Sequence, residues 1–284
     1  MKRMWVLLAS AGLWACSADS DDAAKGAGDA PDISPAALTF DGGDYATDAD
    51  KLAHGGRMVK VLGCLGCHTD TMEGQNITEG DPAFGDIYAA NASLKLPDYS
   101  DEELMRLLKE GVPKDGHEMT FMPSEMFQHA SDADLAAVIA WLRANIQPKG
   151  EPQPPHKPGP ALQAMKEAGE YTYVAEMASQ WKDVLPLDAG PETAKGRYIA
   201  GAACTECHNN ELQGFENFSP NLSLAAMYEP EEFVKLMREG VGKTKPDLGL
   251  MAVTARGRFA NFTDDEIAAL HAYLKARAEN LPPE

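Results

Sequence analysis

The chain has 284 residues, a length that suits two domains of about 100 residues plus connecting segments. Its 44 acidic and 25 basic side chains give a formal net charge of −19. This charge excludes nucleic acid as a partner, because phosphate backbones are bound by clustered Lys and Arg. It favours partner proteins with basic docking patches and salt-sensitive association, although acidity that only keeps a protein soluble would give the same count.

Residues 1–15 predict an export signal, because Lys2 and Arg3 precede an apolar run that is too short to span a bilayer comfortably. Residues 13–16 (LWAC) resemble a bacterial lipobox, which implies cleavage before Cys16 and a lipid on its thiol. An ordinary signal peptide cut nearby is the alternative, and Cys16 would then be lost or free. We therefore expect a protein exported to the periplasmic side of a bacterial membrane and held there by an N-terminal lipid anchor. Loss of the two basic residues would change the charge from −19 to −21.

Residues 16–48 are rich in Asp, Ala and Gly and hold few large apolar side chains, which predicts an acidic, flexible tether. We place the first domain over residues 49–146 and expect its first helix at residues 50–63. Gly55 and Gly56 are poor helix formers, and a close approach of another helix best explains them, because a missing Cβ lets two backbones meet.

One pentapeptide, residues 64–68 (CLGCH), recurs 140 residues later as residues 204–208 (CTECH). Two thiols at this spacing can add to the two vinyl groups of one porphyrin, and the adjacent imidazole can then reach its iron. A redox dithiol does not need the His, and a zinc ribbon usually places its two pairs about 15–20 residues apart. The motif therefore predicts two covalently bound haem c groups. The attachment positions are Cys64, Cys67, Cys204 and Cys207, and the proximal iron ligands are His68 and His208.

The elements around the two motifs also repeat. A capping box at residues 100–103 (SDEE) opens one helix, and a second box at residues 131–134 (SDAD) opens the next. In the second half, residues 228–241 match residues 99–112 at an offset of 129, and residues 263–266 (TDDE) cap the final helix. The shared order predicts an internal duplication.

Residues 147–189 separate the two copies. Six prolines among polar residues at 147–160 predict a semi-rigid linker, whereas the sequence assigns no role to residues 161–189. We place the second domain over residues 190–284.

Both halves resemble class I cytochrome c domains, and the tandem resembles the di-haem cytochromes that carry electrons in bacteria. The resemblance covers about residues 50–146 and 190–279, and it rests on the two Cys-x-x-Cys-His motifs, on Met122-Pro123 and on residues 251–274. It implies an all-α fold wrapped around each haem, in which the first and last helices of a domain cross. The crossing contacts it implies are Gly56 with Trp141 and Gly196 with Tyr273.

Met122 and Met251 are the predicted sixth ligands of the two irons. Met thioether and His imidazole are the usual distal ligands of haem c. Met122-Pro123 matches the family pattern, and Met251 shares the offset of 129 without a gap, although Ala252 stands in place of Pro. Core packing is the alternative role of either methionine. In the first domain the rival ligands are His117 and His129.

Two further expectations concern groups around the haems. A proximal imidazole normally donates its second N–H to a carbonyl group. Residues 220–222 resemble the segment of the cytochrome c family that supplies this carbonyl, and residues 75–77 stand in the matching place of the first domain. Arg57 and Arg197 could pair with haem propionates, but exposure to solvent is the expected fate of both.

The resulting hypothesis is one-electron transfer, because two irons with His and Met ligands leave no open position for a substrate. Electrons would pass from a membrane-associated or periplasmic donor, such as a dehydrogenase or quinol-linked complex, to a downstream redox partner, and the chain would not itself be an enzyme. The alternative is a di-haem peroxidase, which needs one haem that can open and acid–base residues beside it. Gas or redox sensing would need an output domain, for which the sequence offers no segment.

Overall fold

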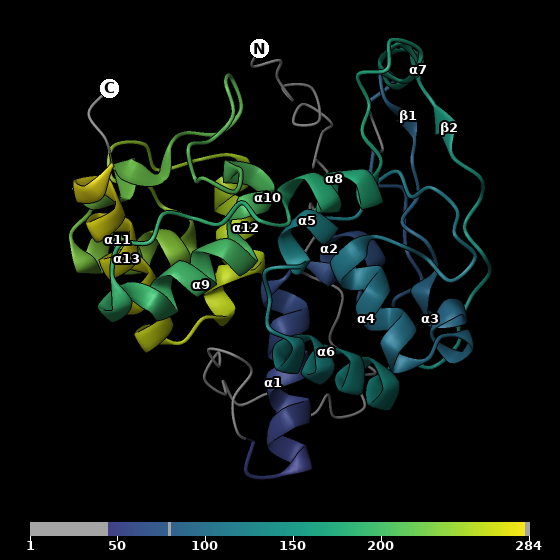
Figure 1. Cartoon of the computed structure of the whole chain (residues 1–284), viewed down its shortest axis with the longest axis horizontal. Helices are drawn as coiled ribbons and strands as arrows, with labels where there is room; N and C mark the ends of the chain where they lie inside the picture. The colour runs from purple at the N-terminus through teal and green to yellow at the C-terminus, as the bar shows by residue number, and fades with distance from the viewer. Residues whose placement is uncertain (1–44, 79–80, 282–284) are drawn as a thin grey trace.

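The computed structural model describes residues 45–78 and 81–281. The expected export signal, Cys16 and nearly all of the tether lie outside these residues. The described chain is mostly helical, which confirms the all-α prediction, and it forms two halves that lie side by side (Figure 1). No helix in the described part is long and apolar enough to cross a membrane.

Both halves begin with a long helix, continue into the short helix of the motif and end with a capped helix. The first half contains α1 (Asp48–Val61), α2 (Cys64–His68), β1 (Gly85–Asp86), α3 (Ala92–Lys95), η1 (Leu96–Asp98), α4 (Asp101–Glu110), α5 (Ser124–Phe127) and α6 (Asp132–Asn145). The connecting segment carries β2 (Lys157–Pro158), α7 (Pro160–Glu167) and α8 (Val174–Trp181). The second half contains η2 (Pro191–Thr193), α9 (Ala194–Ala203), α10 (Thr205–His208), η3 (Leu222–Met227), α11 (Pro230–Glu239), α12 (Leu250–Gly257), η4 (Phe259–Asn261) and α13 (Asp264–Asn280).

Two of the predicted capping boxes are confirmed. The side chain of Ser100 accepts a hydrogen bond from the main-chain N–H of Glu103, and the Glu103 carboxylate accepts one from the N–H of Ser100. Thr263 and Glu266 form the same reciprocal pair at the start of α13. Each pair satisfies two N–H groups that the first turn of a helix would otherwise leave without a partner.

The box predicted at α6 is only half right. Ser131 accepts a hydrogen bond from the main-chain N–H of Asp134, but the Asp134 carboxylate does not return to Ser131. It accepts a hydrogen bond from the hydroxyl of Tyr198 in α9, and the N–H of Ser131 donates to the same hydroxyl at 3.0 Å. A contact between the two halves therefore replaces the local one.

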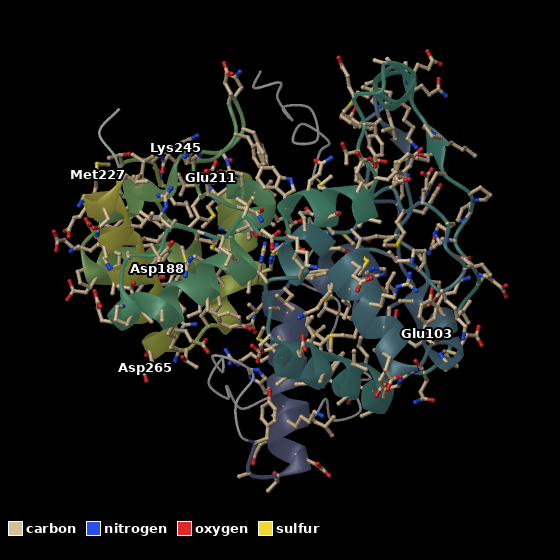
Figure 2. The ribbon with its side chains drawn as sticks, in the orientation of Figure 1. Glu103, Asp188, Glu211, Met227, Lys245 and Asp265 are labelled. Carbon is tan, nitrogen blue, oxygen red and sulfur yellow. The ribbon has the colours of Figure 1, made fainter. Side chains whose placement is uncertain are left out.

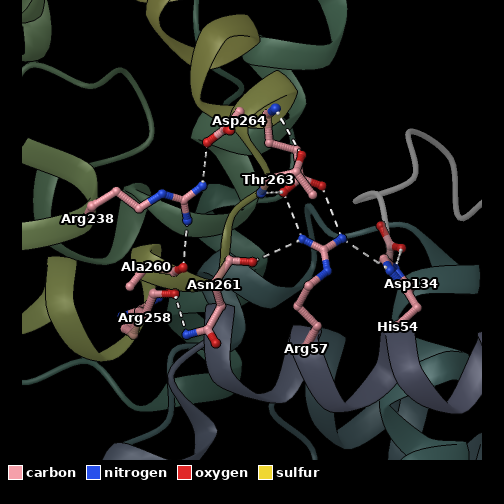
Figure 3. Close-up of polar contacts among 10 residues, drawn as sticks. His54, Arg57, Asp134, Arg238, Arg258, Ala260, Asn261, Thr263 and Asp264 are labelled. Atoms are coloured by element: carbon pink, nitrogen blue, oxygen red, sulfur yellow. Dashed lines mark hydrogen bonds and ion pairs between the residues drawn. The ribbon is translucent and has the colours of Figure 1, made fainter. Parts of the chain in front are cut away.

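The corresponding contact from the first half to the second joins Arg57 of α1 to Glu266 of α13 (Figure 3). The guanidinium donates to both carboxylate oxygens, at 2.7 and 3.1 Å, and the two side chains are 2% and 0% exposed. The expectation that Arg57 would be exposed to solvent is wrong. Its partner Glu266 lies 209 residues away in the chain, so nothing near Arg57 in the sequence indicates that it is buried. On the other side of Arg57, His54 contacts the Asp134 carboxylate at 2.6 Å. The first helix of each half thus reaches the first turn of the other half's last helix, which holds the halves together.

The crossing of α9 and α13 is the one that the resemblance implied. A Cβ on Gly196 would lie 2.1 Å from the carbonyl oxygen of Ala269 and 2.5 Å from the Cβ of Tyr273. Only a residue without a Cβ fits at that distance.

In the first half the crossing residue is Gly55 rather than Gly56, which corrects the expected contact. A Cβ on Gly55 would lie 2.0 Å from the carbonyl oxygen of Ala137 and 3.0 Å from the Cβ of Trp141. The register differs because one more residue separates this glycine from its motif than in the second half. Gly63 accommodates the extra residue by turning at a φ of +78° directly before α2.

Residues 147–174 pack on the first half, whereas residues 184–187 contact the second half, where Arg197 donates to the carbonyl oxygen of Pro186 at 2.7 Å and Tyr273 to that of Leu187 at 2.9 Å. The Asn91 side chain donates to the carbonyl oxygen of Lys149 at 2.8 Å, and β2 pairs with β1 in antiparallel register. The fully buried Leu162 of α7 belongs to a separate small core, together with Phe84, Ile87 and Tyr171.

Candidate haem sites

Each motif places its histidine so that one ring nitrogen is fixed and the other is free. In α2 the Nδ1–H of His68 donates to the carbonyl oxygen of Ala90 at 3.0 Å, and in α10 His208 donates to Pro220 at 2.9 Å. Histidines that bind a metal are normally oriented in this way. Nε2 is therefore the atom that each ring can offer to iron.

The carbonyl in the second half lies in the expected segment, residues 220–222. In the first half it belongs to Ala90 and not to residues 75–77, so that expectation is wrong. The sequence did contain a signal: an Asn-x-Ser stretch follows each carbonyl residue, at residues 91–93 and 221–223. A longer loop between the motif and this stretch in the first half displaces it from the position that simple counting suggests.

Two glycines allow the carbonyl segments to approach the motifs. Gly74 and Gly214 have φ values of +75° and +79°, and their N–H groups donate to the carbonyl oxygen of the motif histidine at 3.0 and 2.9 Å. A Cβ on either glycine would lie 2.6 Å from the carbonyl oxygen of Ala90 or Pro220, respectively. Both the positive φ and the close approach require Gly.

Burial sets the protonation of the motif side chains. It lowers the pKa of His68 and of His208, while the hydrogen bond to the carbonyl acts in the opposite direction, so both rings are neutral at neutral pH. Burial also raises the pKa of the Cys64 and Cys204 thiols to about 12, whereas a redox dithiol needs a lowered pKa. Among residues 45–78 and 81–281 no group of three His, Cys, Asp or Glu side chains could hold a metal ion. Free thiols beside a neutral imidazole with an available Nε2 fit haem c in both halves.

The two predicted distal ligands lie in different backbone settings. Met122 and Met251 are both partly buried against the main hydrophobic core. Met122 precedes α5, whose N-cap is Pro123, so it stays outside the helix. Met251 is the second residue of α12, because Ala252 leaves the preceding residue free to be helical, whereas Pro123 disfavours the helical conformation for Met122.

The histidines that could rival the methionines as distal ligands have other surroundings. The side chain of His117 is 61% exposed and pairs with Asp115. His129 faces the second half, where its Nε2 accepts a hydrogen bond from Asn210 at 2.8 Å. His271, which the sequence places inside the last helix, is buried there.

Arg258, at the end of α12, lies between the two motifs, a position that no sequence pattern indicates. Its Nε donates to the carbonyl oxygen of Val61 at 3.0 Å, and its Nη1 pairs with Glu206 at 2.8 Å. Its Nη2 lies 3.9 Å from the sulfur of Met126, and a Cβ on Gly63 would lie 2.9 Å from its Nε. Glu206 belongs to the second motif and Gly63 directly precedes the first. The same cation therefore faces both motifs, and its charge partly offsets the effect of burial on the pKa of the thiols in each.

Comparison with models of protein families gives a match to the family described as cytochrome c, over residues 52–145 and again over residues 193–278. The two matched segments cover more than half of the chain and coincide with the two halves of the fold. No curated protein matched the chain in a direct comparison of sequences.

Proposed function

The chain belongs to the cytochrome c family, with two of its domains in tandem, and from this premise we propose that each of its two haem c groups has one histidine and one methionine ligand. Haem c supplies the one-electron couple of its iron. The observation that supports the proposal best is the repeated proximal geometry, in which His68 and His208 each present Nε2. With Met122 and Met251 on the distal sides, neither iron keeps a position for a substrate. The chain is then an electron carrier rather than a peroxidase.

We also propose that electrons pass between the two sites within one chain. Arg258 contacts Val61 before the first motif and Glu206 inside the second, so the motifs lie on either side of one side chain. A fixed positive charge at this place favours the added electron on either side of it.

The proposed partners are redox proteins with basic docking patches. Exposed carboxylates lie on the outside of the second half at Asp188, Glu211 and Asp265 (Figure 2). The donor would be a dehydrogenase or a quinol-linked complex. Salt screens such contacts over about 8 Å at physiological ionic strength, so electron exchange should slow as salt rises. A rate that does not depend on salt would remove the acidic surface from the docking step.

Proteins with haem c are typically extracytoplasmic, and we place this chain on the periplasmic side of a bacterial membrane with a lipid on Cys16. Mass spectrometry of protein extracted from membranes should show two haem additions and an acylated Cys16. A mature chain that lacks Cys16 would disprove the anchor and leave the haem proposal unaffected.

The ligand assignment can be tested by absorption spectroscopy of the ferric protein. A thioether ligand on ferric haem c gives a weak far-red charge-transfer band, so the wild type should show this band at the intensity of two haems. Met122→Ala and Met251→Ala should each remove one share of the band and lower the potential of that haem, because the thioether favours the ferrous state. Met119→Ala and Met126→Ala are the controls and should leave the band unchanged, since neither has a methionine at the matching position of the second domain.

The outcome separates the two functions that the sequence left open. Half the band in the wild type would mean that one iron lacks a methionine, and rapid peroxide turnover by that protein would then favour the peroxidase. A band that survives Met122→Ala but not Met119→Ala would show that the distal ligand of the first domain is misassigned.

A further inference from the structure

The connecting segment, to which the sequence assigned no role, leads to the methionine of the first domain. We call residues 147–181 the strap. It leaves the end of α6, runs along the first half through β2 and α7, and reaches α5 with α8 (Figure 1). There it contacts residues 119–121, which directly precede Met122.

Two hydrogen bonds join the strap to this loop. The hydroxyl of Tyr171 donates to the carbonyl oxygen of Thr120, and the main-chain N–H of Val174 donates to the carbonyl oxygen of Met119 at 3.1 Å. The ring of Phe121 adds an edge-on contact with the ring of Tyr171, with centroids 6.3 Å apart. All three residues before Met122 are therefore held by the strap.

The strap is itself firmly placed. Leu162 is fully buried, Tyr171 is 8% exposed and Val174 is 2% exposed. The ammonium group of Lys166 lies 5.0 Å from the centre of the Tyr171 ring, where a cation is attracted by the ring face. Val174 also packs so closely on Gly111 that a Cβ there would lie 2.6 Å from it. A segment with this much buried surface can fix the loop that it contacts.

The second domain holds the matching loop differently. Residues 248–250 precede Met251, and the N–H of Gly249 donates to the Asp247 carboxylate only two residues away at 2.8 Å. Gly249 is exposed, and apart from its two chain neighbours no atom of the described chain lies within 4 Å of the position of a Cβ on it. Within residues 45–78 and 81–281, no hydrogen bond reaches this loop from outside the second domain, and Ala252 of α12 takes the place of Val174 by packing on Gly240, the counterpart of Gly111.

We propose that the strap is a positioning element, in which Tyr171 and Val174 hold residues 119–121 so that the thioether of Met122 stays on the first iron. Met251 lacks such a segment and is the ligand that a small neutral or anionic molecule displaces first. The second haem is therefore the site of ligand exchange. This inference rests on the histidine and methionine ligation proposed above.

The test follows the far-red band of the ferric holoprotein during titration with imidazole. The wild type should lose the band in two phases, with the second domain's share lost at the lower concentration. In a Met251→Ala background the remaining band reports only the first haem. Tyr171→Phe in that background should reduce the imidazole concentration for half displacement roughly fivefold, as expected for the loss of one hydrogen bond.

Two further variants separate the hydrogen bonds from general packing. Val174 is the first residue of α8 and follows Tyr173 at φ −74° and ψ 159°, a position that accepts Pro. Val174→Pro therefore removes the N–H and keeps the helix, and it should reduce the displacing concentration by a similar factor. Tyr173→Phe is the control and should change nothing, because it removes only the hydroxyl of a ring that contacts Tyr171 edge-on with centroids 5.1 Å apart.

The two proposals fail in different ways. If Met251→Ala leaves the band at full strength, the ligation is wrong and the strap proposal falls with it. If Met251→Ala halves the band but Tyr171→Phe and Val174→Pro respond to imidazole as their background does, the strap proposal alone is wrong. A wild type that loses the whole band in a single phase also contradicts it.

Discussion

In the first domain the loop before the methionine is held by residues from outside the repeat, whereas in the second domain the same loop bonds to its own neighbours. On the proximal side the two domains are nearly identical. Both motif histidines donate to a carbonyl oxygen, at 3.0 and 2.9 Å, and both are followed by a glycine with a φ near +75° to +79°. The duplication has thus preserved the geometry that orients the imidazole, and it has diverged where the distal loop meets the rest of the chain.

The comparison extends to the contact between the domains. Each domain inserts a residue of its first helix against the last helix of the other, but Arg57 forms a charged pair with Glu266 while Tyr198 donates from a hydroxyl to Asp134. Removal of the Glu266 charge leaves Arg57 charged and buried without its partner, which is costly, whereas removal of the Tyr198 hydroxyl leaves the buried Asp134 its contact with His54. The two contacts are equivalent in position and differ in what their removal should cost.

The largest expected effect is therefore at Glu266. Glu266→Gln keeps the shape of the side chain but leaves Arg57 charged and buried, which should lower the free energy of unfolding by about 3–5 kcal/mol. Urea unfolding of the holoprotein measures it. Asp188→Asn is the control, because Asp188 is 68% exposed and pairs with Arg197 at 3.2 Å, and it should change stability by less than about 0.5 kcal/mol. Equal effects of the two variants would contradict the assignment of Arg57 to a buried pair.

A second difference between the domains is a buried carboxyl group. Glu125 in α5 corresponds to Thr254 at the offset of 129, and among the described residues its Oε2 has no hydrogen-bond partner. Burial raises the pKa of Glu125 from 4.5 to about 8. The folded protein then binds this proton more tightly than the unfolded chain, so stability is full below about pH 4.5 and is lost as the pH rises through about 8.

Glu125→Gln should remove this loss. A pKa difference of one pH unit between the folded and unfolded states corresponds to about 1.4 kcal/mol, so the variant should gain up to about 5 kcal/mol over the wild type above pH 8 and nothing near pH 4. Unfolding curves at several pH values measure the difference. Glu118→Gln changes an exposed carboxylate in the loop that leads to α5 and serves as the control. A parallel pH profile for wild type and Glu125→Gln would show that the carboxyl does not titrate in this range.

The helix crossings, by contrast, should respond equally in the two domains. Gly55→Ala and Gly196→Ala each place a Cβ about 2 Å from a carbonyl oxygen of the facing helix, which should cost about 1–3 kcal/mol in each case. Gly257→Ala is the control, because no described residue outside its own helix backbone and chain neighbours has an atom within 4 Å of its Cβ position, and it should be neutral or slightly stabilising. Thermal unfolding followed by circular dichroism compares them. A tolerated Gly55→Ala would show that the crossing of α1 and α6 is looser than that of α9 and α13.

Much of this architecture could be predicted from the sequence because its signals are local. The two motifs and the boxes at Ser100 and Thr263 need only spacing and residue type, whereas the contact of Gly196 with Tyr273 was implied by the resemblance to cytochrome c domains. The carbonyl of Pro220 was likewise implied by the family resemblance of residues 220–222.

The remaining features depend on insertions and on partners that are distant in sequence. The extra residue before the first motif moves the crossing from Gly56 to Gly55, and nothing local reveals it until the turn at Gly63 is seen. The burial of Arg57 depends on Glu266, and the role of Arg258 depends on two motifs that are 140 residues apart. A single sequence does not show such pairings, because each partner alone is typical of an exposed surface.

The smallest expected effect is at His129, which occupies in the first domain the position that Arg258 occupies in the second. His129 and Arg258 share the offset of 129, and each contacts the other domain. Burial, followed by the nearby charge of Lys109, lowers the pKa of His129 to about 4. The unfolded chain binds this proton below about pH 6.5 and the folded protein does not, so stability is full above pH 6.5 and is lost as the pH falls through 4. His129→Gln keeps an acceptor for Asn210 and cannot titrate, so it should recover about 1–2 kcal/mol at pH 4.5, a value reduced for the partial exposure of the ring.

Arg258→Gln should lower the free energy of unfolding by the same amount at pH 7 and at pH 4.5, because the guanidinium stays charged throughout. Urea midpoints of both variants at these two pH values decide the matter, and a change that is independent of pH in His129→Gln would show that the ring is already charged in the folded protein.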